Sequence, residues 1–273
     1  MSTFKNKVAI ITGSSQGIGK TLALEMCQKG ASVVLNGRTE SKLLKTLEEL
    51  KLLGHDVIAV RGDITSLKDC EKIVSETIQA FGQIDFLINN GSVTMQEKID
   101  CIETEVFESV FSSNSMGAFY PTKAALPYLK KTKGSVIFIS SLAGLHAMPS
   151  ASGYSMGKMS LSSLWQSLSI ELSHTGIHFG ICYLSFTKSE KGKTMLTANG
   201  NSIPVPKRPR FILQSQNKVA KSIMRVIKYR KPKRVFSIFG KIVSAFFRYF
   251  PGLVMRIMIL NQKKQQNHSF ETG

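Results

Sequence analysis

Residues 8–19 read VAIITGSSQGIG, and this stretch decides the fold. It begins with a short continuous apolar run, Val8 to Ile11, as a buried parallel strand should. The run passes into a glycine-rich loop and then into a helical pattern that includes Leu22 and Met26. Glycines at a strand-to-helix turn let the backbone approach a ligand closely, and the helix N-terminus offers unpaired N–H groups to a pyrophosphate. The stretch therefore predicts a dinucleotide site at the start of a βαβ unit.

Short apolar runs alternate with helical stretches, without a linker, from residue 7 to about residue 181. A chain of 273 residues is compatible with one large domain or two. The uninterrupted alternation favours one continuous sheet. The strands that it predicts are Val8–Thr12, Ser32–Asn36, Val57–Gly62, Phe86–Asn89, Val136–Ser140 and His178–Leu184.

The second informative motif is Tyr154 with Lys158, four residues later. On a helix this spacing places the phenol and the ammonium on one face. A free tyrosine has a pKa of about 10, and a nearby cation favours the phenolate and moves the pKa toward the working range. Ser141, at the end of an apolar run, has a hydroxyl that could point at the same space. A tyrosine and a lysine at this spacing are usually ordinary surface residues when no other motif accompanies them. Here the glycine-rich loop makes a catalytic interpretation the better one.

Together these motifs resemble those of the short-chain dehydrogenase/reductase family. The matching residues follow the family's order over roughly residues 5–190, and they are Thr12, Gly13, Gly17, Ile18, Gly19, Asp63, Asn89, Asn90, Gly91, Asn114, Gly117, Ser141, Tyr154 and Lys158. The resemblance implies an α/β fold with a doubly wound parallel sheet of the Rossmann type, as a single domain.

The resemblance also implies roles for individual residues. Tyr154 would be the catalytic acid/base, and Lys158 would hold the cofactor ribose and lower the tyrosine pKa. Ser141 would orient the substrate carbonyl, Asn114 would anchor a water of the proton relay, and Asp63 would meet the adenine. Contacts with the cofactor are expected from Gly13, Ser15, Gln16, Gly17, Ile18, Gly19, Arg38, Asp63, Ile64, Asn90, Tyr154, Lys158 and Ser189.

The second predicted strand indicates which nicotinamide cofactor binds. A site that prefers NAD places Asp or Glu about 20 residues after the glycine loop. Here Gly37 stands where the family's aspartate would be, and Arg38 follows it. The planar guanidinium can grip a 2′-phosphate or stack on adenine. NADP(H) is therefore favoured over NAD, although Gln16 replaces a second basic residue that often accompanies NADP. The alternative is that Arg38 is a solvated loop residue.

One departure from the family pattern concerns the nicotinamide. After the sixth strand the family usually has Pro-Gly, whereas this chain has Ser185 and Phe186. Phenylalanine enters left-handed conformations only with strain, so we expect the nicotinamide wall to be built differently. Ser189 would stand in for the threonine that commonly meets the carboxamide. The departure motivates an alternative function, a membrane-associated nucleotide-binding scaffold or sensor with little turnover.

The charge is concentrated in the last quarter of the chain. The sequence has 36 basic and 18 acidic residues, a formal charge of +18. From Pro204 onward there are 16 basic residues and one acidic residue, so +15 of this charge lies there. We therefore predict a catalytic domain over residues 1–203 and a basic, apolar, helical extension over residues 204–273.

The extension is amphipathic. Arg234, Lys241 and Arg248 recur every seven residues between apolar stretches, and Pro251 interrupts the pattern. The sequence contains no run of about 18 uncharged apolar residues, which disfavours a simple membrane-spanning helix. The better interpretation is that segment 234–260 lies in the bilayer interface as a helix, with its basic residues near anionic lipid. The alternative is a tail that packs on its own domain or on a second subunit; nucleic acid is disfavoured because the sequence has no recognised reading motif.

These patterns lead to one functional expectation. We expect an NADP(H)-dependent oxidoreductase that interconverts a carbonyl and a secondary alcohol on an apolar, lipid or steroid-like substrate. Scattered cysteines and an N-terminus without an apolar signal segment place it in a reducing compartment, on the cytoplasmic side of a membrane, and indicate no metal site. A loop-rich lid is expected over about residues 187–213. A homodimer and a homotetramer both remain open.

Overall fold

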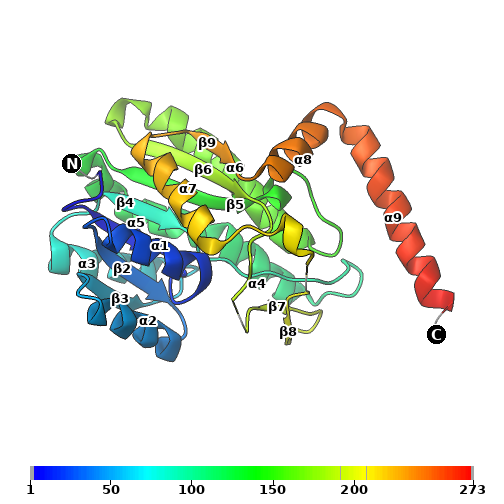
Figure 1. The fold of residues 1–273 in the computed structure, drawn as a ribbon, viewed down its shortest axis with the longest axis horizontal. Coiled ribbons are helices and arrows are strands. Elements are labelled where there is room, and N and C mark those ends of the chain that lie inside the picture. Colours follow the sequence, from blue (N-terminus) through cyan, green and yellow to red (C-terminus); the bar gives the residue numbers. More distant parts are fainter. Residues whose placement is uncertain (1–2, 191, 207, 272–273) are drawn as a thin grey trace.

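A seven-stranded parallel sheet forms the centre of the molecule (Figure 1). The computed structural model describes residues 3–190, 192–206 and 208–271, with side chains in the last helix described as far as Gln262. The strand order is β3-β2-β1-β4-β5-β6-β9, and each neighbouring pair is parallel. These strands are β1 (Val8–Ile11), β2 (Ser32–Gly37), β3 (Val57–Arg61), β4 (Phe86–Asn89), β5 (Ser135–Ser141), β6 (His178–Leu184) and β9 (Lys233–Val235).

Helices cover both faces of the sheet, which confirms the predicted doubly wound α/β fold. One hydrophobic core lies under α1, α2 and α7, and a second lies under α3, α5 and α6. The helices are α1 (Gly17–Cys27), α2 (Glu40–Leu52), α3 (Leu67–Phe81), α4 (Thr104–Asn114), α5 (Met116–Thr132), α6 (Ser152–Glu171), α7 (Gln216–Lys228), α8 (Ile238–Tyr249) and α9 (Pro251–Glu271). The six predicted strands are confirmed to within one residue at each end.

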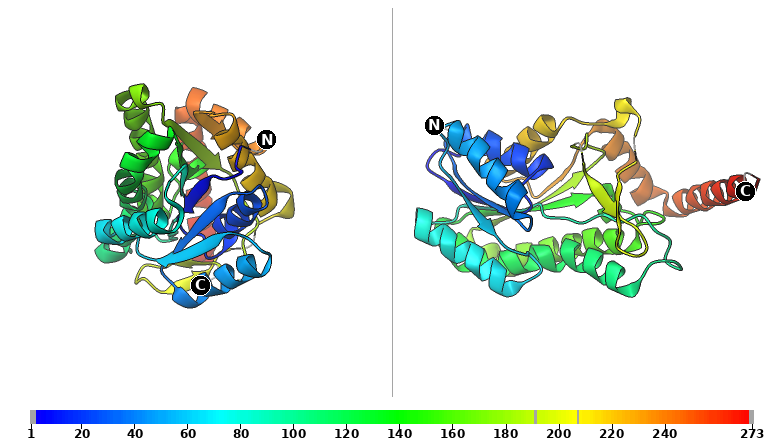
Figure 2. Two further views of the ribbon diagram at one scale, coloured as in Figure 1. Left: turned by 90° about the vertical axis from the view of Figure 1, so that its left-hand side faces the viewer. Right: turned by 90° about the horizontal axis from the view of Figure 1, so that it is seen from below.

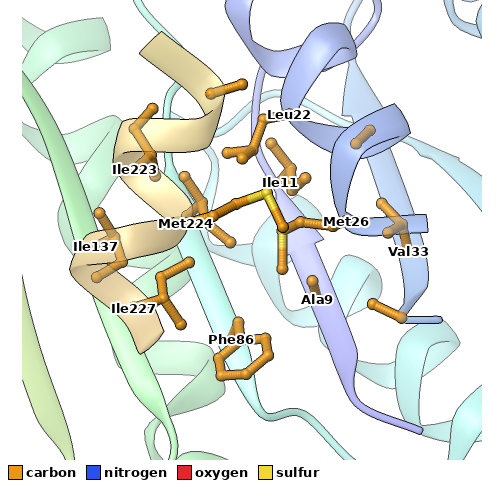
Figure 3. Close-up of a cluster of buried hydrophobic side chains, with 14 of the residues drawn as sticks. Ala9, Ile11, Leu22, Met26, Val33, Phe86, Ile137, Ile223, Met224 and Ile227 are labelled. Carbon is orange, nitrogen blue, oxygen red and sulfur yellow. The ribbon is translucent and has the colours of Figure 1, made fainter. Parts of the chain in front are cut away.

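The sheet-containing domain extends further along the chain than the sequence indicated. Helix α7 packs on α1, where Ile223, Met224 and Ile227 enter the core beside Leu22 and Met26 (Figure 3). Strand β9 then adds a seventh strand beside β6. The structure therefore draws the boundary after β9 and not at residue 203, because the sequence boundary followed the change in charge, which does not report packing.

The expected lid carries short regular elements. Strands β7 (Thr194–Leu196) and β8 (Ser202–Pro204) form an antiparallel hairpin, and Leu196 bridges to Met95. The amide of Gln96 donates to the Leu196 carbonyl at 3.0 Å. The hairpin is thus tied by backbone hydrogen bonds to the segment that follows β4, so the lid has a defined position over the carboxyl ends of the strands.

Helices α8 and α9 leave the body of the molecule in succession, and α9 projects away from it (Figures 1 and 2). The chain bends by 109° between them, at Pro251, where the sequence predicted a break. Arg234 lies in β9, so the predicted seven-residue row of cations on one helix is wrong at its first member. Within the described part of the chain, no single helix has the length and apolar composition of a membrane span, whereas α8 and the first part of α9 together do.

A buried histidine joins the last three strands of the sheet. His178, at the start of β6, is 7% exposed. Its Nδ1 lies 3.2 Å from Ser135 Oγ on β5, and its Nε2 lies 3.0 Å from the Lys231 carbonyl just before β9. Burial lowers the pKa of His178 to about 4, with the backbone bond to Lys231 opposing this shift and the Arg230 charge adding to it. The ring is therefore neutral in the folded protein at neutral pH.

We expect His178 to make stability depend on acidity. Its folded pKa of about 4 lies below the usual 6.5, so its contribution is complete above pH 6.5 and is lost as the pH falls toward 4. The loss should approach about 3 kcal/mol, at 1.36 kcal/mol per pKa unit. Urea unfolding at several pH values measures it. His178→Gln should flatten the dependence, and the exposed His174→Gln should retain it; equal slopes in both variants would contradict the assignment.

Candidate active site

The loops after β1 and β4 hold each other closely at the carboxyl edge of the sheet. Thr12 Oγ1 accepts hydrogen bonds from the amides of Asn90 (2.9 Å) and Gly91 (3.0 Å). The Asn90 side-chain amide donates to the carbonyls of Thr12 and Gly13, each at 3.0 Å. A Cβ on Gly13 would lie 2.7 Å from the Gly91 Cα, and Gly13 has a φ of +61°. Only glycine fits this contact, which leaves the loop backbone open to a ligand.

The N-terminus of α1 already receives an anionic oxygen. The Gly17 amide donates to Glu190 Oε2 at 2.6 Å, and Glu190 belongs to the lid. A φ of +62° at Gly17 turns the loop into the helix. A Cβ on Gly19 would collide with the Gly13 carbonyl and the Asn90 side chain. These residues fit a dinucleotide pyrophosphate, because the first amide of the helix is directed at an anionic oxygen, a place that the Glu190 carboxylate takes here.

Two basic side chains border the far end of this cradle, next to β2. Arg38 follows β2 and lies 3.5 Å from Asp63 Oδ2, with both side chains partly exposed. Partial burial raises the pKa of Asp63, but hydrogen bonds from Thr65 and the charge of Arg38 outweigh it and hold that pKa below its usual value. Lys42, in the first turn of α2, lines the same end. Lys42 is not among the residues predicted from the sequence, although it is a second basic residue only four positions after Arg38.

Ser141, Tyr154 and Lys158 meet where β5 ends and α6 begins. Lys158 is 3% exposed, and its Nζ donates to the Ile139 carbonyl at 3.0 Å. The same ammonium lies 5.9 Å from the centre of the Tyr154 ring. Ser141 ends β5, accepts a hydrogen bond from the Ala143 amide at 3.2 Å, and hydrogen-bonds the Tyr154 phenol. The structure thus brings together the three side chains that the sequence placed in one site.

The protonation of this cluster differs from the sequence expectation. Burial raises the pKa of Tyr154 above 10, and the hydrogen bond from Ser141 opposes the rise. Burial, aided by the charge of Lys193, lowers the pKa of Lys158 to about 7. The expected lowering of the tyrosine pKa is therefore not found, because desolvation disfavours both charged forms. At neutral pH Tyr154 carries its proton, as a proton donor to a carbonyl requires.

Asn114 lies just behind this cluster, at the end of α4. Its side-chain amide donates to the carbonyls of Val93 (2.7 Å) and Val110 (2.8 Å). Its Oδ1 is buried and has no hydrogen-bond partner among the described protein groups. A buried acceptor without a partner costs about 1–3 kcal/mol, so a bound water is the expected partner. Its geometry fits the predicted water anchor.

Ser185 and Phe186, which replace the family's Pro-Gly, join the site to α8. Ser185 Oγ lies 2.9 Å from Ser237 Oγ, just before α8 begins. The Phe186 and Phe239 rings are 6.4 Å apart, and Phe186 does not adopt a positive φ. Phe239, Val243 and Phe247, on one face of α8, line the cleft. The wall is built differently from the family pattern, as expected, and here Phe186 packs on the C-terminal extension without left-handed strain.

A single cleft of about 1500 Å³ joins these groups. Twelve of the predicted site residues line it: Gly13, Ser15, Gln16, Gly17, Ile18, Arg38, Ile64, Asn90, Ser141, Tyr154, Lys158 and Ser189. Gly19 and Asn114 lie behind its surface, and Asp63 lines a smaller hollow beside Arg38. The cleft therefore runs from the cofactor cradle, past the Tyr154 cluster, to the apolar face of α8.

Comparison with known sequences agrees with this geometry. The family model for short chain dehydrogenase matches residues 7–199. An Arabidopsis thaliana protein named 11-beta-hydroxysteroid dehydrogenase 1A is 34% identical over 227 residues, covering 80% of this chain and 64% of that protein. Another, 11-beta-hydroxysteroid dehydrogenase-like 4A, is 40% identical over 168 residues, covering 61% of this chain and 56% of that protein. The chain thus spans less than two thirds of the length of these relatives.

Solved structures with the same fold also match. An alcohol dehydrogenase from the archaeon Thermococcus sibiricus, complexed with 5-hydroxy-NADP, is 21% identical with a TM-score of 0.73, covering 84% of this chain and 95% of that one. A short chain dehydrogenase/reductase from Burkholderia phymatum, in complex with NAD, is 22% identical with a TM-score of 0.75, covering 86% and 90%. The chain belongs to the short-chain dehydrogenase/reductase family of oxidoreductases, whose fold binds a nicotinamide cofactor.

We expect Tyr154→Phe to reduce turnover by about 10²–10⁴-fold, because it removes the proton donor and keeps the ring. Binding of the reduced nicotinamide cofactor, measured by fluorescence, should persist, because the glycine cradle is untouched. The assay is oxidation of that cofactor in the presence of a ketone such as 2-tridecanone. Tyr128→Phe, on α5 and outside the cleft, is the control and should keep full activity. Near-normal turnover in Tyr154→Phe would refute the assignment.

Proposed function

We propose that this protein is an NADP(H)-dependent ketoreductase for apolar substrates at a membrane surface. The observation that carries the proposal is one continuous cleft in which a glycine cradle, the Tyr154 cluster and an apolar wall follow each other. A scaffold or sensor would need the cradle alone. The departure that suggested such a role, Ser185-Phe186, has a separate structural explanation as the attachment of α8.

The chemistry follows from the residues around Tyr154. NADPH, when bound, supplies a hydride to the substrate carbonyl. Tyr154 donates its proton to the carbonyl oxygen, and Ser141 hydrogen-bonds that oxygen and fixes its direction. Lys158 is held by the Ile139 carbonyl, which directs its ammonium toward the cofactor ribose and the phenol. Asn114 Oδ1, which has no partner among the described protein groups, holds a water in the relay that returns a proton to Tyr154.

The preference for NADP(H) is proposed from charge. Arg38 and Lys42 border the end of the cleft beside β2, and Gly37 ends that strand without a carboxylate. Asp63 pairs with Arg38 and holds its guanidinium near the cleft. A 2′-phosphate would form charge-assisted hydrogen bonds there, whereas the 2′-hydroxyl that NADH has in its place would gain much less.

The apolar substrate and the membrane surface are proposed from α8 and α9. One face of α8 lines the cleft, and its other face leaves Ile238, Ile242, Phe246 and Tyr249 exposed. On α9, Leu253, Met255, Ile257, Ile259 and Leu260 are also exposed. So many exposed apolar side chains on two successive helices mark an interaction site. Relatives named as hydroxysteroid dehydrogenases support a hydrophobic substrate for this chain as well.

The cofactor prediction concerns Arg38. NADPH should bind more tightly than NADH, and Arg38→Ala should remove most of the difference. The expected loss is about 10- to 150-fold, the equivalent of one charge-assisted bond of roughly 1.5–3 kcal/mol. Fluorescence titration with both cofactors measures it. Lys45→Ala, which removes an exposed charge from α2 outside the cleft, should change nothing. Equal affinities in the unmodified protein would reject the preference.

The membrane prediction concerns the outer face of α8. The protein should sediment with anionic vesicles more than with neutral ones, and salt should reverse only part of the binding. Apolar burial gives about 25 cal/mol per Å², and each basic residue near the headgroups about 1 kcal/mol. Ile242→Ser with Phe246→Ser should weaken binding to both vesicle types while NADPH still binds, because neither side chain lines the cleft.

The control for this experiment is Leu52→Ser, which removes an even more exposed apolar side chain from α2, away from the extension. It should bind vesicles like the unmodified protein. The outer face of α8 would instead contact a second subunit if the protein did not sediment with vesicles and formed an oligomer that the double variant dissociates. The membrane proposal would then be wrong.

A further inference from the structure

Four cations of the lid line the cleft. Lys188, Lys193, Arg208 and Arg210 all contribute to its wall. None of the ion pairs among the described residues involves any of them. The one acidic side chain that the lid adds to the cleft, Glu190, bonds the Gly17 amide. A cleft proposed to bind an apolar substrate therefore also has an excess of positive charge.

Two of these cations lie beside the reacting groups and the apolar wall. The Arg208 guanidinium lies 4.1 Å from the centre of the Phe186 ring, which in turn faces Phe239 of α8. Lys193 is close enough to lower the pKa of Lys158 by its charge. The Lys193 carbonyl accepts a hydrogen bond from the Val205 amide at 3.2 Å, which joins the two arms of the lid. A backbone hydrogen bond thus positions Lys193, and stacking on the Phe186 ring positions Arg208.

The cofactor does not account for all of this charge. Lys188 belongs to the cofactor side, because its carbonyl accepts a hydrogen bond from Gln216 Nε2 (3.1 Å), and Gln216 Oε1 accepts one from Thr21 of α1 (3.0 Å). Arg208 stacks instead at the α8 end of the cleft. Arg208 is therefore available for an anion other than the cofactor pyrophosphate, and Lys193 and Arg210 line the same cleft.

We propose that the substrate is an anionic amphiphile, a ketone or secondary alcohol that carries an apolar chain and a carboxylate or phosphate group. The anionic group binds Lys193, Arg208 and Arg210, and the chain lies on Phe239, Val243 and Phe247. Charge-assisted hydrogen bonds from these side chains to an anionic group are stronger than hydrogen bonds between neutral groups. This inference rests on the proposed ketoreductase function and narrows its substrate class.

Binding tests the inference without turnover. Fluorescence titration of the NADP⁺-loaded protein with parinaric acid and with its methyl ester compares one chain with and without the charge. The acid should bind about tenfold more tightly or better. Arg208→Gln should remove most of that advantage and leave the ester unchanged. Arg225→Gln, exposed on α7 and outside the cleft, is the matched charge control and should retain it.

A second variant decides where the carboxylate binds. If Arg248→Gln, which changes the outer face of α8, removed the advantage and Arg208→Gln did not, the carboxylate would bind outside the cleft and the inference would be wrong. Equal affinity of the unmodified protein for acid and ester would also overturn it. A loss of NADP⁺ affinity in Arg208→Gln with the acid preference intact would assign the cation to the cofactor.

Turnover separates this inference from the proposed function. NADPH oxidation is measured with 1-palmitoyl-dihydroxyacetone phosphate and with its dephosphorylated form, which share one ketone. We expect a kcat/KM about tenfold or more higher for the phosphate, and a loss of this ratio through KM in Arg208→Gln. Equal kcat/KM values would overturn the inference and leave the ketoreductase function standing. Oxidation of NADPH with neither these nor neutral long-chain ketones would reject the function itself.

Discussion

The hydrogen bonds between the loops after β1 and β4 set the position of everything else in the site. Thr12 Oγ1 and the Asn90 side chain join two adjacent strands at their carboxyl ends. The contact is so close that position 13 accepts only glycine. Because parallel strands place all their carboxyl ends at one edge, the same edge receives Ser141 from β5 and Ser185 after β6. The cleft is the space that this edge leaves beneath the lid.

Desolvation determines the chemistry of the cluster in that cleft. Lys158 is almost fully buried, and burial lowers its pKa while it raises the pKa of Tyr154. The cluster therefore holds a protonated phenol beside a lysine that gives up its proton more easily than a free lysine. This arrangement is suited to giving a proton to a carbonyl. An additional negative charge near Lys193 and Lys158 would raise the pKa of both lysines and so favour their cationic forms.

The C-terminal extension is part of the active site as well as an appendage. Ser237 and Phe239 connect α8 to Ser185 and Phe186, the residues that replace the family's tight turn. One face of α8 thereby closes the cleft, and the opposite face is apolar and exposed. A substrate that reaches the protein along the outer face of α8 would have only one helix to pass before it meets the Tyr154 cluster.

The amino-acid sequence by itself determined the sheet, the glycine cradle and the identity of the central polar cluster. These features depend on local patterns: apolar runs of strand length, glycines at a turn, and a spacing of four between Tyr154 and Lys158. The tertiary structure decided what depends on distant contacts. Strand β9 is only three residues long, and its basic composition concealed that it pairs with β6. Helix α7 was assigned to the tail by its charge, yet its apolar face packs on α1. Burial also reversed the expected shift of the Tyr154 pKa, because desolvation depends on packing that no local motif records.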